Sequence, residues 1–434
     1  MERILEQAKK AAEAAEVFVV TTEEAPVQFE ANRLKHIQSR QSRLVALRII
    51  RKGRVGYSVT TDTGDISSLV DSAVETAEFG TKAGFELPDL ANYPEVDTYD
   101  PEVERVPLET MIALGQEMID AVRGNNADII CEGGVDRDVT SVRILSSNGG
   151  EASYRKSIFS LGIEGSLIRG TDMLFVGESE SSCHPLTDTR AVTDIVLKQL
   201  DWAKEQATAP IKPLPVIFTP NGVASAIVSP LMVAFNGKVV LQGASPIGDK
   251  LGKPIFDEKL CLQDDATVAY RPASRPFDDE GVPSHSTALI EAGVPTSFLY
   301  DLQTAALAKK QSTGNGNRHG GGLPSPSPSA FVIQPGETTF DDMLADMKEG
   351  LVVEYLMGAG QGNILGGDFS GNVLLGYKVE NGRIVGRVKD TMVSGNIYKL
   401  LKDIAAIGSD ARWVGSSLST PSLYFPNVSV ASKG

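Results

Sequence analysis

The chain has 434 residues, of which 41% are hydrophobic and 22% are charged, as expected for a globular protein of two or three domains. Because 41 Lys and Arg face 56 Asp and Glu, the formal net charge is −15, which disfavours a broad phosphate-binding surface and hence direct nucleic-acid binding. No apolar run approaches the ~20 residues of a membrane helix, and the charged N-terminus lacks the apolar core of a signal peptide. Three widely spaced cysteines without a CxxC pair argue against a disulfide framework, so we expect a cytoplasmic protein.

The first part of the chain alternates helical and strand-like patterns. We expect an opening helix over residues 4–15, then strands at 17–22 and 27–32 around a turn at 23–26. The further elements are expected in this order: hairpin strands at 44–50 and 54–60 joined at Lys52-Gly53, an amphipathic helix at 66–77 capped by Asp65, an exposed connector at 87–106, a helix after Pro107, strands at 142–145 and 158–163, and a helix at 192–203.

A Pro-rich stretch at residues 208–215 marks the expected boundary between two domains. We expect residues 1–210 to form a mixed α/β domain, and residues 211–434 to form a mainly antiparallel β-rich domain with a few helices, since glycine turns recur there at short spacing. The elements expected in the second domain are a strand at 216–218, a helix-like run at 221–235, short helices at 301–309, 339–347 and 396–404, and a Pro-Ser loop or strand lead-in at 324–329. The predicted fold class is therefore α+β.

Glycines are densest between residues 350 and 395, where tight backbone positions recur between apolar runs. The Asn381-Gly382 pair, flanked by strand-like residues, predicts a hairpin turn. The glycine-rich pieces at 314–316 and 358–362 complete no nucleotide-binding pattern, because the first lacks a third glycine at the right offset and the second lacks a Lys-Ser/Thr ending. We interpret both as turns that let backbone segments pack closely.

Several ordered sequence blocks resemble the TldD/PmbA family over the whole second part of the chain. They are residues 277–282 (Phe-Asp-Asp-Glu-Gly-Val), 290–294 (Ile-Glu-Ala-Gly-Val), 312–316 (Ser-Thr-Gly-Asn-Gly), 350–395 and 407–410 (Ile-Gly-Ser-Asp). The first part of the chain matches more weakly, in the order of its elements rather than in motifs.

This resemblance implies two kinds of subunit with one fold. The TldD kind looks like a zinc metallopeptidase, with a helical HExxxH segment early in its second domain and a cysteine near its end. The PmbA kind, also called TldE, lacks these residues and is thought to pair with TldD. Here the equivalent helix, residues 222–235, contains no His, Glu, Asp or Cys, and residues 411–419 have serines where TldD has its cysteine. The chain therefore resembles the PmbA/TldE kind, and we expect no zinc ligand or catalytic residue in it.

Other candidate centres involve the histidines. His285 and His319, with a carboxylate from residues 278–280, form one conceivable metal site. A Cys-His pair at 183–184 and a Ser-His-Ser triplet at 284–286 are conceivable nucleophile and base pairs. We favour ordinary loop histidines, because no tight ligand spacing occurs, adjacent strand residues point to opposite faces, and no Gly-x-Ser-x-Gly elbow is present.

The leading interpretation is a non-catalytic subunit, TldE/PmbA-like, of a TldD/TldE-type cytosolic zinc metallopeptidase complex that acts in peptide proteolysis or maturation. Zinc is expected only in the TldD-type partner, with which this chain forms a heterodimer. An unfolded or extended peptide is expected to add to an exposed sheet edge. The residues expected to face substrate or partner are Asn315, Gly316, Asn317, His319 and Asp368.

Two alternatives stay open on sequence alone. The first is a homodimeric peptide- or protein-binding regulator without protease activity, the class to which the family's label as modulator of DNA gyrase belongs. With a net charge of −15, such a regulator would act through proteins rather than on DNA. The second is an autonomous hydrolase that uses His285, His319 or a serine.

Overall fold

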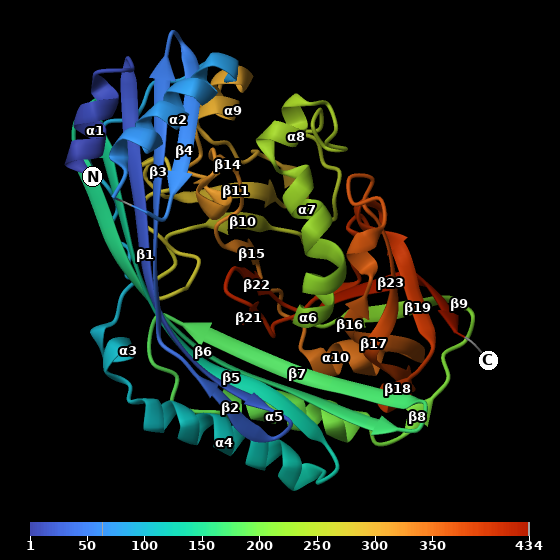
Figure 1. Ribbon diagram of the computed structural model, residues 1–434. Coiled ribbons are helices and arrows are strands. Elements are labelled where there is room, and N and C mark those ends of the chain that lie inside the picture. Colours follow the sequence, from blue (N-terminus) through green and yellow to red (C-terminus); the bar gives the residue numbers. More distant parts are fainter. Residues whose placement is uncertain (63, 433–434) are drawn as a thin grey trace.

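The computed structural model describes residues 1–62 and 64–432 and has the expected α+β architecture (Figure 1). Its helices are α1 (Glu2–Lys9), α2 (Ile66–Phe79), α3 (Pro101–Arg105), α4 (Leu108–Asn125), α5 (Arg190–Trp202), α6 (Pro220–Val223), α7 (Ser229–Ala234), α8 (Gly237–Leu241), α9 (Leu302–Ala308), α10 (Phe340–Asp346) and α11 (Ile397–Leu400). A π-helical turn, η1 (Ala224–Val228), joins α6 to α7, and 3-10 turns lie at η2 (His319–Gly321) and η3 (Ala359–Gln361). Within the described residues, no helix is both long and apolar enough to span a lipid bilayer.

One long, bent sheet is built from residues 14–182. Its strands are β1 (Ala14–Glu30), β2 (Arg33–Ile37), β3 (Arg40–Arg51), β4 (Arg54–Thr60), β5 (Ile130–Ser146), β6 (Glu151–Arg169) and β7 (Asp172–Ser182). The antiparallel order is β4-β3-β1-β5-β6-β7, and β2 pairs with the last residues of β1. Helices α1 and α2 cover one face over β1, β3 and β4, and α4 covers the same face over β5 (Figure 1). We call this covered face the outer face and the opposite one the inner face.

The rest of the chain forms further sheets. Their strands are β8 (Gln206–Ala207), β9 (Lys212–Phe218), β10 (Leu262–Asp265), β11 (Ser286–Glu291), β12 (Val294–Pro295), β13 (Gly316–Asn317), β14 (Ser325–Pro326), β15 (Phe331–Ile333), β16 (Glu349–Met357), β17 (Asp368–Glu380), β18 (Arg383–Val388), β19 (Thr391–Asn396), β20 (Ala406–Ile407), β21 (Arg412–Val414), β22 (Leu418–Thr420) and β23 (Leu423–Ser432). One sheet has the order β16-β9-β23-β19-β17-β18-β8, another the order β12-β11-β10-β15-β22-β21, and β13 pairs with β14. Because β16 also pairs with β17, the path from β16 through β9, β23 and β19 to β17 closes into a ring.

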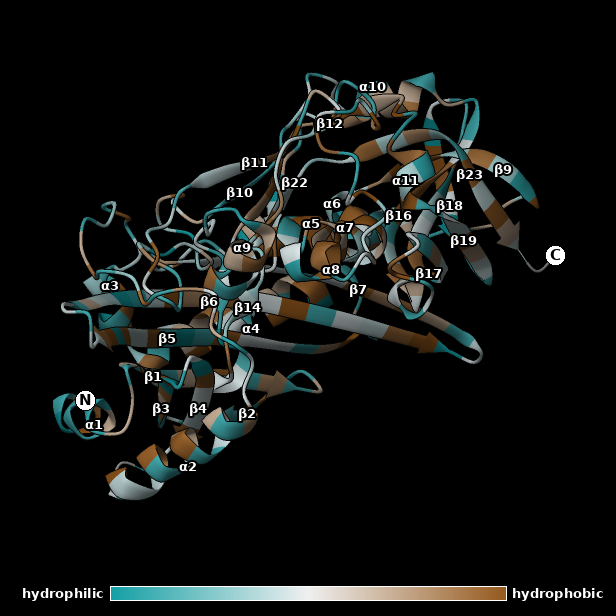
Figure 2. Ribbon diagram, turned by 90° about the horizontal axis from the view of Figure 1, so that it is seen from above, coloured by the Kyte–Doolittle hydropathy of each residue, from teal (hydrophilic) through white to brown (hydrophobic). Residues whose placement is uncertain are grey.

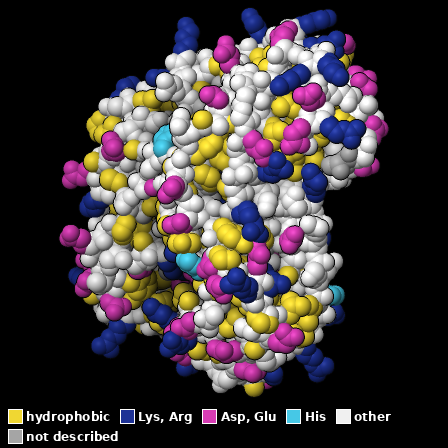
Figure 3. Space-filling model, turned by 90° about the vertical axis from the view of Figure 1, so that its left-hand side faces the viewer, with side chains coloured by type: hydrophobic (Ala, Val, Ile, Leu, Met, Phe, Trp, Pro, Cys, Tyr) yellow, Lys and Arg dark blue, Asp and Glu magenta, His cyan; other side chains and the backbone are white. Residues whose placement is uncertain are grey.

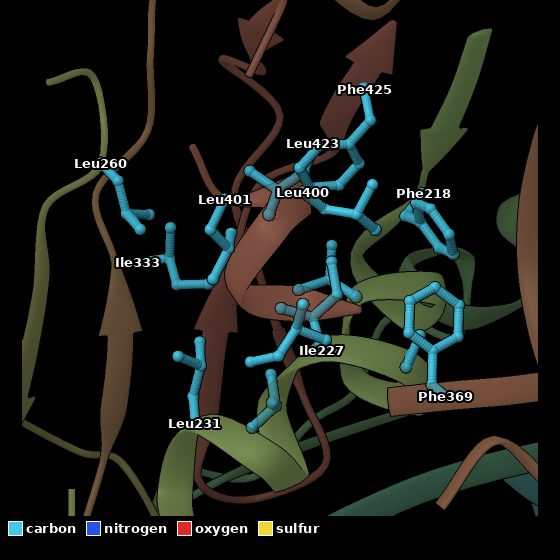
Figure 4. Packing of buried hydrophobic residues seen from close by; sticks show 14 of the residues in the cluster. Phe218, Ile227, Leu231, Leu260, Ile333, Phe369, Leu400, Leu401, Leu423 and Phe425 are labelled. Carbon is cyan, nitrogen blue, oxygen red and sulfur yellow. The ribbon is translucent and has the colours of Figure 1, made fainter. Parts of the chain in front are cut away.

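The largest hydrophobic core lies where η1 and α7 pack against this ring. In this core the rings of Phe218 and Phe369 meet at one end, Ile227 lies in the middle, and Leu231 lies at the other end (Figure 4). Figure 2 shows hydrophobic colouring over most of α7, whereas hydrophobic and hydrophilic positions alternate along α2, which covers the sheet surface. Helix α7 buries Pro230, Leu231 and Ala234 and exposes Ser229, so its apolar side faces this core.

Three expectations for the first part of the chain are wrong. Helix α1 ends at Lys9, and β1 runs unbroken from Ala14 to Glu30, so residues 23–26 are not a turn. Pro26 is tolerated because β3 pairs with β1 only as far as Glu24 and β2 begins to pair at Val27, so Pro26 lies in the gap between them. The connector at 87–106 is not simply exposed, since it contains α3 and buries four apolar side chains, those of Leu87, Leu90, Val103 and Val106.

Other expectations are confirmed. Asp65 caps α2, accepting a hydrogen bond of 3.0 Å from the amide of Ser68. The turn residues Lys52-Gly53 and Asn381-Gly382 have positive φ angles and join antiparallel strands.

The run at 221–235 is helical and contains a π turn before Pro230, and the three short helices are present as α9, α10 and α11. The 324–329 segment includes the short strand β14. Sheet composition fits a division near residue 210 except that β8 pairs with β18, so this domain boundary stays a prediction.

Candidate functional site

The structure buries two of the residues expected to face substrate. The Asn315 amide nitrogen donates to Asp264 Oδ2 at 2.6 Å and to the Ser327 carbonyl at 3.1 Å. Gly316 donates its amide to Asp278 Oδ2 at 2.7 Å. Both residues are buried, so their polar groups are used inside the protein.

The other three expected site residues lie nearer the surface but not together. Asn317 pairs with Ser325 in the small β13–β14 sheet, and His319 is exposed at the start of η2. Asp368 lies at the start of β17, in another sheet, and accepts a hydrogen bond of 2.8 Å from Asn396 Nδ2. The structure therefore groups residues 315–319 and separates Asp368 from them. A substrate- or partner-facing role for any of them stays a prediction.

Residues 278–280 form a turn that is hydrogen-bonded to the loop after residue 312. Asp278 Oδ1 accepts backbone hydrogen bonds of 2.9 Å from both Glu280 and Val282, while its other oxygen holds Gly316. Asp279 Oδ2 accepts a 2.8 Å hydrogen bond from the Arg318 amide. A side chain at residue 316 would collide with the Glu280 carboxyl, so only glycine fits there. Two of the sequence blocks are thus neighbours that fix each other's backbone.

The histidine-based centres do not assemble. No group of three or more His, Cys, Asp or Glu side chains that could hold a metal occurs in the described chain. Ser284 Oγ is buried and has no hydrogen-bond partner in the part of the chain that the structure describes, while its neighbour His285 is exposed. Burial raises the pKa of Cys183 to about 11, so its thiol stays protonated at neutral pH. His184 instead pairs on the surface with Asp100 at 2.7 Å.

The helix that spans α6, η1 and α7 is the segment that the resemblance equates with the HExxxH helix of the TldD kind, and it contains a π turn. A π turn stacks residues five apart over one another, which is the arrangement that a pair of histidines at HExxxH spacing needs to share one ion. Ile227 and Leu231 point into the hydrophobic core, and Gly222 lies against the Val353 carbonyl so closely that a Cβ would overlap it. Apart from the side-chain amide of Asn221, the helix offers only apolar groups, hydroxyls and two prolines, so it lacks the thiolate, imidazole or carboxylate donors that zinc needs.

A polar cluster surrounds the start of this helix. Thr219 Oγ1 donates to Glu354 Oε2 at 2.9 Å, and Asn221 Nδ2 donates to Glu178 Oε2 at 3.1 Å. Arg412 lies 2.7 Å from the same Glu178 oxygen and neutralises it. Among the described residues no cation lies within ion-pair distance of Glu354, and burial raises the pKa of its carboxyl to about 7. The cluster therefore contains one carboxyl, that of Glu354, whose protonation changes near neutral pH.

A cavity of about 870 Å³ opens beside this cluster. Its floor is formed by β5, β6 and β7, and Asn221, Tyr355 and Val414 from the second part of the chain also line it. The floor has three glycines in neighbouring strands, because Gly134 is opposite Gly162 and Gly177 lies in the next strand. Backbone without side chains lets a ligand's main chain approach closely. Carboxylates of Glu30, Glu132, Asp136 and Glu164 surround these glycines.

In the middle of β7, next to this cavity, the backbone groups of Gly177 on the free edge of the strand are already hydrogen-bonded. The Gln199 side chain accepts a hydrogen bond of 2.9 Å from the Gly177 amide and donates one of 3.2 Å to its carbonyl. Tyr355 Oη donates to the same carbonyl at 3.2 Å. An added strand cannot pair with Gly177 while these bonds stand, so the open surface of this region is the face of the sheet rather than its edge.

Sequence reasoning missed Glu178, Glu354, Arg412 and the cavity. One signal was present, since Glu354 is a single carboxylate inside the apolar run of β16 and such a residue needs a partner or a shifted pKa. Nothing local pointed to Glu178 or Arg412, which lie in different parts of the chain.

Comparison with known proteins places these features in a family. Residues 212–432 match the family model described as the PmbA/TldA metallopeptidase C-terminal domain, and residues 15–77 match its domain 1. Metalloprotease PmbA of Escherichia coli O157:H7 is 26% identical over 98% of this chain and 94% of that protein. An uncharacterized protein of Methanocaldococcus jannaschii is 27% identical over 98% of each chain.

Solved structures show the same fold. TldE from Thermococcus kodakarensis superposes with a TM-score of 0.90 at 22% identity, covering 99% of both chains. A Thermotoga maritima protein described as a putative modulator of a DNA gyrase superposes with a TM-score of 0.88 at 22% identity, again over 99% of both chains. At this level of identity, the likeness establishes the arrangement of the elements.

Proposed function

Because the chain belongs to the PmbA/TldD family, we propose that it is a TldE/PmbA-type, non-catalytic subunit of a two-subunit cytoplasmic zinc peptidase. In this proposal a TldD-type paralogue supplies zinc and the catalytic residues. The present chain completes the assembly and helps to hold an unfolded or extended peptide for proteolysis or maturation.

The observation that carries this proposal is the helix over α6, η1 and α7. It keeps a π turn, whereas its side chains are those of a hydrophobic core. Zinc needs thiolate, imidazole or carboxylate ligands, and a general base is required beside a metal-bound water. The carboxylates nearest this helix, Glu178 and Glu354, are engaged by Arg412 and Thr219, and neither is accompanied by a histidine.

Two further observations support a role in holding peptide rather than nucleic acid. The cavity beside the helix is lined by glycine backbone and carboxylates, which would repel phosphate. On the side of the molecule shown in Figure 3, Lys and Arg side chains are interspersed with Asp and Glu and form no continuous positive surface. Both agree with the net charge of −15.

Co-expression with a HExxxH-bearing paralogue from the same genome tests the proposal. We expect the two chains to co-elute, one zinc per heterodimer, and cleavage of an unstructured peptide that chelator abolishes. Replacing the motif glutamate in the paralogue by Gln should abolish cleavage without separating the chains. A paralogue that is fully active alone and does not bind this chain would contradict the proposal.

The same experiment distinguishes the homodimeric regulator, which the likeness to structures described as putative modulators of DNA gyrase keeps open. A regulator of this kind should self-associate, should ignore the paralogue and should be captured with a non-peptidase partner protein.

A further inference from the structure

An apolar patch adjoins the carboxylates on the inner face of the long sheet. Ile130, Ile168 and Met173 are 45%, 59% and 48% exposed, which is unusual for such large side chains close together. They share a face, because Ile168 is directly opposite Met173, and Ile130 is opposite Ser166, two residues before Ile168. Phe175 lies opposite Ser166 on the other side and adds a ring to the patch.

The same face carries two carboxylates that oppose each other. Glu132 of β5 is directly opposite Glu164 of β6, and no cation lies within ion-pair distance of either among the described residues. Like charges at directly opposite positions destabilise a sheet. Asp136 and Asp138 follow on the same face of β5, and burial raises the pKa of both carboxyls. This arrangement is complementary to a cation that the described chain does not supply.

The spacing of the two features fits an extended polypeptide. Residues two apart on one face of a strand are about 6.6 Å apart, so the patch begins about one such step from the Glu132–Glu164 pair. An extended ligand places alternate side chains at the same interval. Gly134, Gly162 and Gly177 leave its backbone room to lie close to the sheet.

We propose that the inner face of β5, β6 and β7 binds an extended peptide that carries a Lys or Arg and, two or four residues away, a large apolar side chain. The basic group lies between Glu132 and Glu164, and the apolar group lies on the Ile130, Ile168, Met173 and Phe175 patch. This rests on the proposed function of holding peptides and names the peptide class that the chain selects.

Fluorescence anisotropy with the full chain tests the proposal. The probes are labelled ten-residue peptides of Gly, Ser and Thr with a central Lys-x-Leu, with Glu-x-Leu in its place, and with Lys-x-Ser. We expect the Lys-x-Leu peptide to bind at least about tenfold more tightly than either of the others, and to bind more weakly as salt is raised.

Charge reversal locates the site. Glu132→Lys with Glu164→Lys should weaken Lys-x-Leu binding about tenfold or more and should improve Glu-x-Leu binding. Glu75→Lys with Glu78→Lys on α2 makes the same change in net charge at exposed positions on the outer face and should leave both affinities unchanged. Ile168→Ser should erase the preference for Leu over Ser while keeping that for Lys over Glu. Circular dichroism and Tm confirm that each variant is folded.

Three results would overturn the inference. Equal weakening by both charge reversals would mean unspecific attraction, and no weakening by either would place the peptide elsewhere. A dimer in sedimentation that Glu132→Lys with Glu164→Lys dissociates would assign the face to a second copy of the chain. None of these measurements uses zinc or a paralogue. A failed co-expression experiment would therefore contradict the proposed subunit role, whereas a missing peptide preference would contradict only the present inference.

Discussion

Arg48 of β3 and Glu280, 232 residues further along the chain, form an ion pair in which both side chains are buried. The other terminal nitrogen of Arg48 donates to Glu16 Oε2 at 2.8 Å, and Arg318 pairs with the second oxygen of Glu16. Four charges from the two parts of the chain therefore alternate at their contact. Glu280 belongs to the turn that clasps Gly316, so the most recognisable sequence blocks serve to join the second part of the chain to the long sheet.

Removing Glu280 should destabilise the protein strongly. In Glu280→Ala, Arg48 still pairs with Glu16 but loses its second counter-charge at a buried site, and we expect a loss of about 3 kcal/mol in the free energy of unfolding by urea titration. The control is Glu151→Ala, which breaks the half-exposed Arg143–Glu151 pair and should cost less than about 1 kcal/mol. Similar losses for the two variants would mean that the Arg48–Glu280 pair does not hold the two parts together.

Glu354 should make stability fall as pH rises. Burial raises its pKa to about 7 from the 4.5 of an exposed Glu, so between these values the folded state binds more protons than the unfolded state. The folded protein therefore loses stability progressively from pH 4.5 to 7, and the loss stays constant above that range. Glu354→Gln, which keeps an acceptor for Thr219, should be more stable than the parent by about 3 kcal/mol at pH 8 and equally stable below pH 4.5.

Urea unfolding of both proteins at pH 4.5, 6 and 8 measures this difference. A Glu354→Gln effect that is the same at all three values would show that the carboxyl ionises at its ordinary pKa. Asp249→Asn, at an exposed position, is the control that should show no such growth with pH.

An element of this fold could be predicted from the sequence only where the residues that determine it are neighbours in the chain. Local patterns located α2 with its Asp65 cap and the Asn381-Gly382 turn, because caps and positive-φ turns are decided by neighbouring residues. The length of β1 was not predictable, since Pro26 is harmless only because two different strands meet beside it.

The candidate site was less predictable still. Its floor combines residues of β5, β6 and β7, and polar alternation in one strand does not reveal what the next strand presents. The resemblance to a family indicated which helix lacks metal ligands. The position of Glu132 directly opposite Glu164, by contrast, depends on the register between β5 and β6, which the sequence does not reveal. Only Glu354, alone in an apolar strand, gave a signal within its own segment.

Two glycines of α4 should respond oppositely to the same substitution. A Cβ at Gly115 would overlap the buried ring of Phe29, so Gly115→Ala should lower the free energy of unfolding by about 1–3 kcal/mol through overpacking. Gly124, in the last turn of the same helix, has no atom within 4 Å of the added Cβ. Gly124→Ala should therefore raise stability by about 0.5–1 kcal/mol, since alanine favours the helix. Changes of the same sign would contradict the close contact between α4 and β1.

Zinc should leave the stability of the purified chain unchanged. A ligand that binds only the folded state at a thousand times its Kd stabilises it by about 4 kcal/mol, which is easily seen as a rise in Tm. Because the helix over α6, η1 and α7 offers no zinc ligand, we expect the Tm with micromolar zinc and with excess chelator to agree. The TldD-type paralogue, measured in parallel, should lose Tm on chelation. A chelator-sensitive Tm in this chain would instead require a zinc site formed by other residues, and metal analysis of the same sample would give its stoichiometry.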